Sequence, residues 1–454
     1  MAKKNEIIQG TIEKIKFPNK GVLYTEEGIP VHVVDAFIGQ KLEVRLCKKR
    51  KGKWDGRIHQ VVENPDFFVP AKCSYFGLCG GCSLQHIPYE MQLSHKHEQV
   101  RTLLGHAGIE GYEDLGVIGS PSQWEYRNKM EYSFGDECKN GPVALGMHRK
   151  RSTFDIITVD GCKLVDEDFS RVLRYVLRYT MAYNLPFYQK KSHEGFMRYL
   201  LIRRSETTGD LLINIVTSSQ SDFDLTPLAN ELVSLGTTGK VTGVLHTITD
   251  TLADAVKPDK VTTIYGHDTL TETILGLEFQ ISPFSFFQTN TKGAEVLYKT
   301  ALEMPEDITS KLVFDLYSGT GTIAQIMATK AKEVYGIEIV EEAVVKAKAN
   351  AALNNLDNCH FIAGDVLAQV DQLEVKPELI VLDPPREGIN PKAIQKIIRF
   401  DAKELLYISC KPTSLAKDLP LFEEAGYKVK KVCCVDMFPN TVHVETVALL
   451  VKEN

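Results

Sequence analysis

The amino-acid sequence predicts an α/β protein made of three consecutive parts. From residue 311 to the end of the chain, short apolar strand patterns alternate with helix patterns at regular spacing, which is typical of a doubly wound parallel sheet. Residues 6–62 instead hold β-type runs separated by turn sequences, a pattern typical of a small β-barrel. At 454 residues the chain is long enough for several domains. We therefore expect a barrel at 1–63, a central α/β region at 64–282 and a C-terminal α/β domain at 283–454.

The composition is that of an ordinary soluble protein, with 43% apolar and 25% charged residues. No apolar run has membrane-spanning length and the first residues do not read as a signal peptide, so we expect a cytoplasmic protein, and a monomer. Ten cysteines in a reducing compartment favour metal binding or catalysis over disulfides. Lys and Arg number 53 against 59 acids, for a net charge of −6, so any contact with nucleic acid must use local basic patches.

The barrel is predicted from the runs Glu6–Ile12, Gly21–Thr25, Ile29–Val34, Lys41–Leu46 and Trp54–Val62. Residues 41–57 contain eight Lys or Arg and only two acids, with Trp54 among them. A basic loop beside an aromatic residue suits contact with a nucleic-acid backbone and stacking on a base, while a solvated hairpin tip is the alternative. The pattern resembles the TRAM domain, an OB-like RNA-binding barrel found on RNA-modifying enzymes.

Three cysteines, Cys73, Cys79 and Cys82, fall close together, and the two glycines before the third let the backbone fold tightly around one centre. Such a centre needs a fourth ligand, for which Cys138 and Cys162 are both candidates. The spacing supports zinc or an iron–sulfur cluster and does not choose between them. An accidental cluster of cysteines in a loop is the alternative.

The central region is predicted to begin with a helix from Leu84 to about Gly108. After residue 120, β-type runs alternate with helices near 168–183 and 224–235, as expected for an α/β region that shapes a substrate cleft. The expected strands are Glu131–Phe134, Val143–Met147, Phe154–Val159, Tyr199–Arg204, Asp210–Val216, Val241–Thr247 and Glu278–Ile281. Basic residues recur around Arg127 and Lys129.

The C-terminal strands are expected at Leu312–Tyr317, Glu333–Glu338, Cys359–Ala363, Leu379–Leu382, Leu405–Cys410, Lys428–Val435 and Thr446–Val451. Seven strands, with a reversed strand in the last pair, are similar to the Rossmann-like layout of the S-adenosylmethionine-dependent methyltransferases. That resemblance implies a nucleotide-type cofactor at the carboxyl ends of the strands.

A glycine-containing loop, residues 315–321, follows the first of these strands and opens a helix. Its glycines let the backbone approach a ligand at the turn where nucleotides bind in this fold class. Glu338 ends the second strand, where an acid can hold ribose hydroxyls, and Asp365 follows the third, where it can face an adenine. A solvated strand end or a helix cap is the alternative for each acid.

Asp383 ends the fourth strand and is followed by two prolines, which cannot donate to a ladder, so its carboxylate is expected to face the cleft. Amino-group methyltransferases carry Asp/Asn-Pro-Pro and then an aromatic residue at this point, whereas here Arg386 follows. The departure favours a different chemistry, and an amino-group methyltransferase is kept as an alternative.

Cys410 is predicted at the carboxyl end of a strand and just before a helix that starts near Pro412. A thiolate there can attack an electrophilic carbon, helped by the positive end of the helix, although a small buried cysteine is the simpler interpretation. Glu445, at the start of the last strand, can act as a general base. A cysteine near a cofactor and a base suits methylation of carbon 5 of uracil, which needs thiolate addition at carbon 6 and then proton removal.

Taken together, these motifs resemble the RNA uracil-5-methyltransferase family, the bacterial enzymes that make 5-methyluridine in ribosomal or transfer RNA. The resemblance covers the whole chain and includes residues 285–290, the Asp-Pro-Pro-Arg and Ser-Cys-x-Pro motifs and His-Val-Glu-Thr near the end. It implies that Cys410 is the nucleophile and Glu445 the base. The residues matching positions around S-adenosylmethionine or the target base are Gln288, Tyr317, Glu338, Asp365 and Asp383.

The same resemblance implies a [4Fe–4S] cluster on Cys73, Cys79, Cys82 and Cys162, in place of Cys138. Two positions depart from the family pattern. Lys411 replaces the Asn of Ser-Cys-Asn-Pro, and Ser318 replaces a Cys of the cofactor loop, but neither change removes a reacting group. The barrel and the cluster favour 23S ribosomal RNA as the substrate. A transfer-RNA uracil-5-methyltransferase and a non-catalytic RNA-binding iron–sulfur protein are the alternatives.

Overall fold

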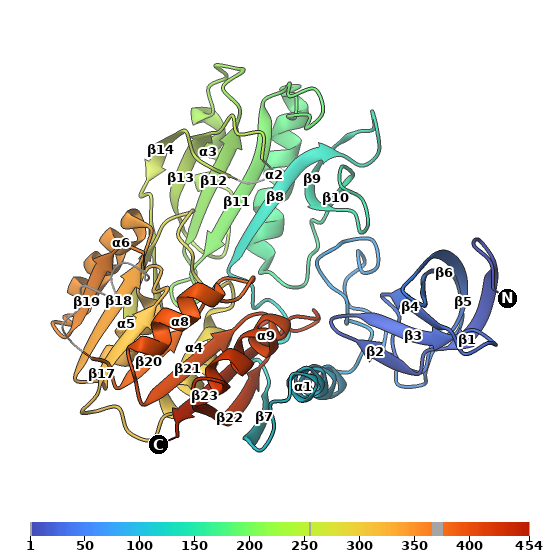
Figure 1. Ribbon diagram of the computed structural model, residues 1–454. Helices are drawn as coiled ribbons and strands as arrows, with labels where there is room; N and C mark the ends of the chain where they lie inside the picture. Colours follow the sequence, from blue (N-terminus) through green and yellow to red (C-terminus); the bar gives the residue numbers. More distant parts are fainter. Residues whose placement is uncertain (1, 254–255, 366–375, 454) are drawn as a thin grey trace.

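The computed structural model describes residues 2–253, 256–365 and 376–453. The chain forms a small N-terminal sheet, a central sheet and a large C-terminal sheet, and Figure 1 shows the N-terminal unit standing to one side of the other two. None of the helices within these ranges combines the length and the apolar character needed to cross a bilayer.

The N-terminal unit is a curled six-stranded sheet in the order β1-β5-β6-β4-β3-β2. Its strands are β1 (Ile7–Thr11), β2 (Lys14–Lys16), β3 (Lys20–Tyr24), β4 (Pro30–Val34), β5 (Lys41–Arg50) and β6 (Lys53–Glu63). The five expected strands are confirmed, and β2 escaped prediction because it is short and two of its three residues are lysines. Trp54 is only 6% exposed and packs in the core of this sheet with Leu42 and Val44. The expectation that it stacks on a base is therefore wrong.

A helix and a strand connect this unit to the rest of the chain. Helix α1 (Tyr89–His106) begins after Pro88, five residues later than expected, because residues 84–88 form a turn that ends at this proline. Strand β7 (Glu113–Ile118) then pairs in parallel with β22 (Tyr427–Val435) and becomes the edge of the C-terminal sheet. The expected boundary at residue 282 is thus crossed by a strand from the central region.

The central sheet has the order β10-β9-β8-β11-β12-β13-β14. Its strands are β8 (Lys129–Asp136), β9 (Val143–His148), β10 (Ile156–Thr158), β11 (Met197–Arg204), β12 (Leu211–Thr217), β13 (Val241–Ile248) and β14 (Lys260–Gly266). The expected helices are present as α2 (Glu167–Ala182) and α3 (Thr226–Val233), and their apolar sides pack against the sheet. Strand β14, which was not expected, has mostly exposed residues and therefore lacks an alternating pattern.

The C-terminal sheet has the order β19-β18-β17-β20-β21-β23-β22-β7, with β23 antiparallel to both neighbours. Its remaining strands are β17 (Leu312–Leu316), β18 (Glu333–Glu338), β19 (Cys359–Ala363), β20 (Leu379–Leu382), β21 (Glu404–Ser409) and β23 (Glu445–Lys452). All seven expected strands are confirmed to within one residue at either end. This sheet carries the methyltransferase-like layout that the sequence predicted.

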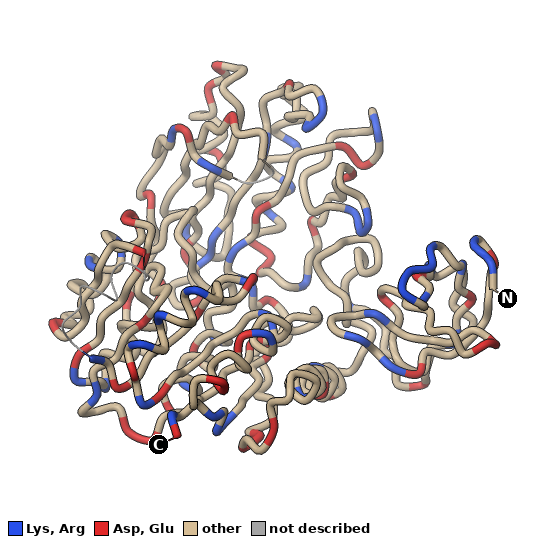
Figure 2. The backbone as a smooth tube through the Cα atoms, viewed as in Figure 1, with Lys and Arg blue, Asp and Glu red and all other residues tan. Residues whose placement is uncertain are grey.

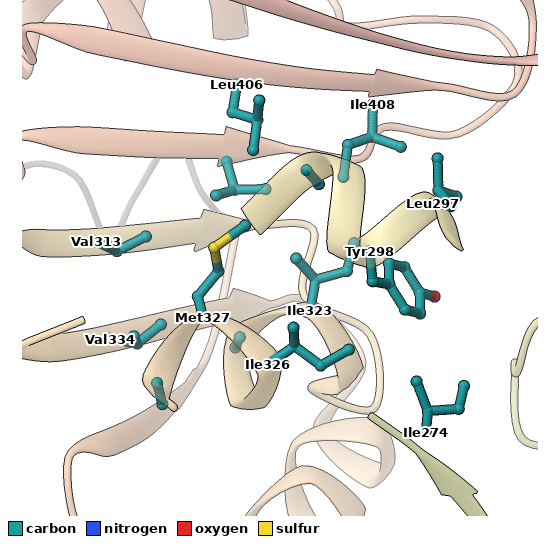
Figure 3. Packing of buried hydrophobic residues seen from close by; sticks show 14 of the residues in the cluster. Ile274, Leu297, Tyr298, Val313, Ile323, Ile326, Met327, Val334, Leu406 and Ile408 are labelled. Atoms are coloured by element: carbon teal, nitrogen blue, oxygen red, sulfur yellow. The ribbon is translucent and has the colours of Figure 1, made fainter. Parts of the chain in front are cut away.

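Two layers of helices cover the C-terminal sheet and bury its apolar side chains. One core cluster joins the hairpin β15 (Leu270–Ile274) and β16 (Leu277–Ile281) with α4 (Thr291–Glu303), α5 (Thr322–Ala328) and α6 (Glu341–Leu353). Figure 3 shows part of it, with Met327 of α5 and Leu297 of α4 lying against the strands. The opposite cluster contains residues of α1, α8 (Pro391–Arg399) and α9 (Pro412–Glu423). Both layers leave the carboxyl ends of β17, β18, β20 and β21 at one edge, where the candidate site lies.

Candidate active site

The loop after β17 is built to bring backbone close to a ligand. Tyr317 and Gly321 both have positive φ, 73° and 79°, and the N–H groups of Tyr317 and Ser318 both donate to the Ile337 carbonyl at 3.1 Å. A Cβ on Gly321 would lie 2.5 Å from the ring of Phe361, so glycine is required there by conformation and by space. The loop therefore leaves a tight turn at the amino end of α5, as expected for a nucleotide-type cofactor.

Glu338 is oriented by two backbone donors at the end of β18. Its Oε2 accepts from the Gly319 N–H at 3.0 Å and its Oε1 from the Val340 N–H at 2.9 Å. The carboxylate is thereby held beside the glycine loop, as the sequence predicted. Asp365 is exposed beyond the end of β19, and its charge acts with burial to raise the pKa of Tyr317 to about 12. Glu338, Tyr317 and Asp365 therefore lie around one end of the loop.

Asp315 is a buried acid to which the sequence analysis assigned no role. It lies at the fourth position of β17, and neither carboxyl oxygen has a hydrogen-bond partner within the described part of the chain. Burial and the nearby charge of Asp383 raise its pKa well above the usual value. The hydroxyl of Ser318 is likewise buried without a partner among the described residues. Unsatisfied buried oxygens beside a glycine loop fit a ligand that brings hydrogen-bond donors.

A second residue that the sequence analysis missed is Tyr298 on α4, because its place in the helix pattern indicates only a core position. Its pKa is raised first by burial and then by the charge of Asp383, with smaller contributions from Glu445 and Asp315, while a side-chain hydrogen bond with Gln288 opposes the shift. Figure 3 shows the ring beside Ile323, with its hydroxyl pointing away from the core cluster. The phenol therefore lies among the acids of the site.

The Asp-Pro-Pro-Arg loop is attached to α9, the helix that follows Cys410. The Ser414 hydroxyl donates to the Arg386 carbonyl at 2.7 Å, and the Ile389 N–H donates to Asp418 Oδ2, also at 2.7 Å. Gly388 has φ of 84°, and a Cβ there would lie 2.6 Å from the Asp418 carboxylate. Two bonds and a required glycine thus set the path of the loop and the position of Arg386.

Cys410 and Glu445 are neighbours at the end of a strand ladder. The preceding residue of β21, Ser409, pairs directly with Thr446 of β23, so the next residues outward are Cys410 and Glu445. Directly opposed residues of antiparallel strands have Cα atoms about 4.5–5.5 Å apart. The register therefore brings the two side chains together, as the predicted nucleophile and base require.

The thiol and the carboxyl both have raised pKa values. Burial, and then the charges of Glu445 and Asp383, raise the pKa of Cys410 to about 11, while Arg386 acts in the opposite direction. The expected help from the amino end of α9 is thus outweighed, and the thiol is protonated at neutral pH. Glu445 is 3% exposed, and burial and Asp383 raise its pKa to about 8, again opposed by Arg386. Burial also raises the pKa of Asp383 itself.

A cavity of about 440 Å³ opens between the C-terminal and central sheets. Gln288, Arg386 and His443 line one side of it, and Arg127 lines it from the central region. Phe286, also in its lining, is 70% exposed. The backbone of the Gln288 segment is fixed by Asn128, whose amide donates to the Gln288 carbonyl at 3.0 Å.

The four predicted cluster ligands Cys73, Cys79, Cys82 and Cys162 all line the same cavity. Cys138 is exposed and does not line it. Burial, followed by smaller effects that include the neighbouring thiols, raises the pKa of Cys82 to about 12 and that of Cys162 to about 11. Within the described ranges no set of His, Cys, Asp or Glu side chains is close enough to hold a single metal ion. The structure thus brings the four cysteines to one cavity, and their described side chains do not form a group that would hold a single metal ion.

Comparisons with known proteins agree with this geometry. Residues 264–453 match the model of the tRNA (uracil-5-)-methyltransferase family. Uncharacterized RNA methyltransferases are 48% identical in Clostridium acetobutylicum, over 100% of this chain and 99% of the relative, and 34% identical in Listeria innocua, over 99% and 98%. The structure of Pyrococcus abyssi tRNA (uracil-54, C5)-methyltransferase in complex with S-adenosyl-L-homocysteine has a TM-score of 0.78 at 24% identity, covering 98% of this chain and 100% of that one. The chain belongs to the RNA uracil-5-methyltransferase family, which uses S-adenosylmethionine to methylate uracil in RNA.

Proposed function

We propose that this enzyme methylates carbon 5 of a uridine in 23S ribosomal RNA through a covalent bond between Cys410 and carbon 6 of the base. The observation that carries the proposal is the strand register that puts Cys410 beside Glu445. The two groups perform the two halves of one reaction, since the first must add to the ring and the second must take a proton from it.

In the first half, the sulfur of Cys410 bonds to carbon 6, and the electron pair of the 5,6 double bond moves toward the carbonyl at carbon 4, which makes carbon 5 nucleophilic. S-adenosylmethionine, when bound, would supply the electrophilic methyl group, and carbon 5 takes it as the bond between the methyl carbon and the sulfonium sulfur breaks with its electron pair staying on that sulfur. The thiol must lose its proton before it attacks, and Arg386 is the cation that opposes the rise in the pKa of this thiol. The guanidinium therefore favours the thiolate.

In the second half, Glu445 takes the proton from carbon 5. The electrons of that C–H bond re-form the 5,6 double bond, and the bond between carbon 6 and sulfur breaks with its electron pair returning to Cys410. A buried carboxylate with a pKa near 8 is a stronger base than an ordinary glutamate. Burial of the side chain thus suits it to proton removal from carbon.

The residues that would hold S-adenosylmethionine are those around the glycine loop. Glu338 is held with its carboxylate beside the loop and suits ribose hydroxyls, and Asp365, which follows β19, is proposed to face the adenine. Gln288, Tyr317 and Asp383 line the same end of the sheet, and the unpaired oxygens of Asp315 offer acceptors to donors of the cofactor. This acceptor-rich set suits a cofactor that carries hydroxyl and ammonium groups.

The four cavity cysteines are proposed to hold a [4Fe–4S] cluster. The proposal is supported by the donor set, because all four cysteines line one cavity and four Cys thiolates are the ligands that such a cluster would take. The methyl transfer moves no net electrons, so the part that these residues play is structural or concerns the placement of RNA. We propose that Cys138 takes no part.

The RNA backbone is proposed to bind two basic surfaces. One is the tip of the β5–β6 hairpin, where the side chains of Lys48, Lys49, Arg50 and Lys51 are exposed. Figure 2 shows Lys and Arg positions on the N-terminal unit in blue. The other is centred on Arg127, which lines the cavity, and on the partly exposed Lys129 two residues further along the chain. The exposed basic residues at the tip of the β5–β6 hairpin support treating residues 1–63 as a TRAM-type RNA-binding unit.

The barrel and the cysteine cluster favour ribosomal RNA, while a transfer RNA is the second candidate because the family model and the structural relative are both named for transfer RNA. The deciding experiment maps 5-methyluridine in ribosomal and transfer RNA from cells with and without the gene. Loss of 5-methyluridine from a position in 23S ribosomal RNA supports ribosomal RNA as the substrate. Loss of 5-methyluridine from transfer RNA alone supports transfer RNA as the substrate. Unchanged marks in both would contradict the proposed function.

A further inference from the structure

Residues 436–444 form the hairpin loop between β22 and β23 and lead directly into Glu445. The loop is bonded to the rest of the molecule at its first residues. Lys96 of α1, fully buried, donates from Nζ to Asp436 Oδ1 at 2.7 Å and to the Phe438 carbonyl at 3.1 Å. A buried ammonium with such partners allows the loop little freedom, because any displacement would leave a charge unpaired.

Asn440 is the most fully bonded residue of this loop. Its N–H donates to Gln92 Oε1 at 2.9 Å, and its carbonyl accepts from the N–H groups of Ser83 and Leu84 at 2.9 and 3.0 Å. Its Oδ1 accepts from Gln92 Nε2 at 3.3 Å, and its Nδ2 donates to the Gln123 carbonyl at 3.0 Å. The residue is 3% exposed and has a left-handed φ of 66°, which asparagine tolerates better than most residues. Every polar group of Asn440 is therefore used, and its partners come from three separate segments.

One of these segments is the cysteine loop. Ser83 and Leu84 directly follow Cys82, and Gln92 also donates to the Leu84 carbonyl at 3.1 Å. The backbone leading out of the cysteine motif is thus joined both to α1 and to Asn440. Two hydrogen bonds thus link the backbone after Cys82 directly to the hairpin loop, and a third joins it to α1.

We infer that Asn440 is a positioning residue for the general base, and that it holds Glu445 in place by fastening the hairpin loop to α1 and to the backbone after Cys82. The inference rests on the covalent mechanism proposed above. It gives the backbone after Cys82 a defined task, the support of proton removal from carbon 5. Small displacements of a catalytic group by a change elsewhere have large effects on rate.

The two halves of the reaction separate this role from general stability. If Glu445 is displaced, Cys410 still bonds to carbon 6 and carbon 5 still receives the methyl group. The proton then stays on carbon 5, the bond between carbon 6 and sulfur is not broken, and methylated RNA remains attached to the protein. A residue needed only for folding would instead reduce both halves together.

The test uses Asn440→Gly in the full-length, iron-loaded protein, because glycine accepts the left-handed backbone while losing the side-chain bonds. Ribosomal RNA from cells lacking the gene is mixed with methyl-labelled S-adenosylmethionine, and labelled RNA–protein adduct is measured on denaturing gels. We expect at least roughly tenfold more adduct than in the unchanged protein, with methyl transfer in the first turnover altered by less than about threefold. Iron per protein should stay the same.

The matched control is Asn355→Gly, which alters an exposed left-handed asparagine at the end of α6 and should behave as the unchanged protein. Gln92→Ala, which removes the partner of Asn440 on α1, should also accumulate adduct and keeps the test available if the first variant folds poorly. Glu445→Gln serves as the reference. If it forms no adduct, the role of the base fails and the inference with it. If Glu445→Gln does form adduct, two results for Asn440→Gly would overturn the inference and leave the proposed function intact. One is an equal loss of methyl transfer and of proton removal, and the other is a normal turnover rate.

Discussion

Lys129 of β8 and Arg203 of β11 are direct partners across two antiparallel strands. Two cations at opposed positions destabilise a sheet. Arg203 is 3% exposed and donates to the carbonyls of Pro283 and Ser285, and burial lowers its pKa to about 10. Burial, and then the charge of Arg203, lowers the pKa of Lys129 to about 8. The charge of Glu131 acts to raise the pKa of Lys129, and this partly exposed lysine, unlike the buried Arg203, is expected to contact an RNA phosphate.

The change Lys129→Gln should therefore weaken RNA binding while stabilising the free protein. We expect the affinity for RNA to fall several-fold, and the salt dependence of binding to weaken by the amount that about one phosphate contact contributes. The free energy of unfolding should rise by about 0.2–1 kcal/mol, because the repulsion between the two cations is relieved. Binding titrations over a salt series and a thermal melt measure the two effects. Lys348→Gln, at an exposed position of α6, is the control, and an unchanged salt slope in Lys129→Gln would contradict the role.

The change Cys410→Ala should abolish methyl transfer, because no other described thiol lies at the end of the β21–β23 ladder. We expect a loss of at least about 10³-fold in turnover, with the affinity for S-adenosylmethionine changed by less than about threefold. Turnover assays and cofactor titration by calorimetry check both quantities. Measurable turnover in the alanine protein would exclude Cys410 as the nucleophile.

Charge on Arg386 should set the pH dependence. The guanidinium opposes the raised pKa of both Cys410 and Glu445, so Arg386→Gln should move both values upward. Since the thiol must lose its proton and the base works as a carboxylate, the turnover rate should rise with pH through about 8 and go on rising toward about 11 in the unchanged protein, with both rises moved to higher pH in the variant. Rates measured from pH 6 to 10 test this. A profile that keeps its midpoint in the variant would show that Arg386 does not act on these groups.

Glu445→Gln should make the folded protein more stable. The folded carboxyl keeps its proton between about pH 4.5 and about 8, where the unfolded chain has released it, so its contribution to stability falls as pH rises through that window. A neutral glutamine avoids this loss. We expect the melting temperature to rise by a few degrees at pH 8 and by less at pH 5. Melting curves of both proteins at pH 8 and pH 5 measure this difference. An equal rise in melting temperature at the two pH values would contradict a raised pKa of Glu445.

The basic tip of the β5–β6 hairpin should act on binding and not on chemistry. Replacing Lys48, Lys49 and Lys51 by Ala should weaken RNA affinity and flatten its salt dependence. Single-turnover methylation at saturating RNA should be unchanged, because the tip is remote from the residues that line the cavity. If the variant binds with the same slope, the tip is only a solvated hairpin.

Protein purified without oxygen should be brown and carry about four irons. The Cys79→Ser protein should lose iron and solubility before its methyl transfer is affected. The Cys138→Ser protein should keep its iron and its solubility, because Cys138 is exposed and is not among the residues that line the cavity. Iron analysis and the visible spectrum measure this. Colourless protein with stoichiometric zinc would contradict a cluster.

The parts of the site that the sequence predicted are those that follow from position along a strand. Cys410, Glu338 and Asp383 each stand where a parallel strand ends, and topology places such residues at one edge whatever the packing details. Glu445 was found in the same way, because its strand starts where its partner stops.

What the sequence did not predict depends on contacts between distant segments. Trp54 looked like an exposed aromatic beside a basic loop, but the curl of the barrel turns it inward. The raised pKa of Cys410 comes first from burial and then from two acids that other strands bring in, Glu445 and Asp383. Asn440 has no local signal at all, since its partner Gln92 lies 348 positions away in the chain.

The pairing of β7 with β22 also constrains how the chain is made. Residues 113–118 leave the ribosome long before residues 427–435. Strand β7 therefore stays unpaired while most of the protein is synthesised. Contacts between such distant segments slow folding and leave an edge open to wrong partners. A gene fragment that encodes the C-terminal part alone would lack this strand and helix α1, and its sheet would end at a bare β22 edge. The catalytic sheet is therefore a product of the whole polypeptide, and its last strand was among the first to be translated.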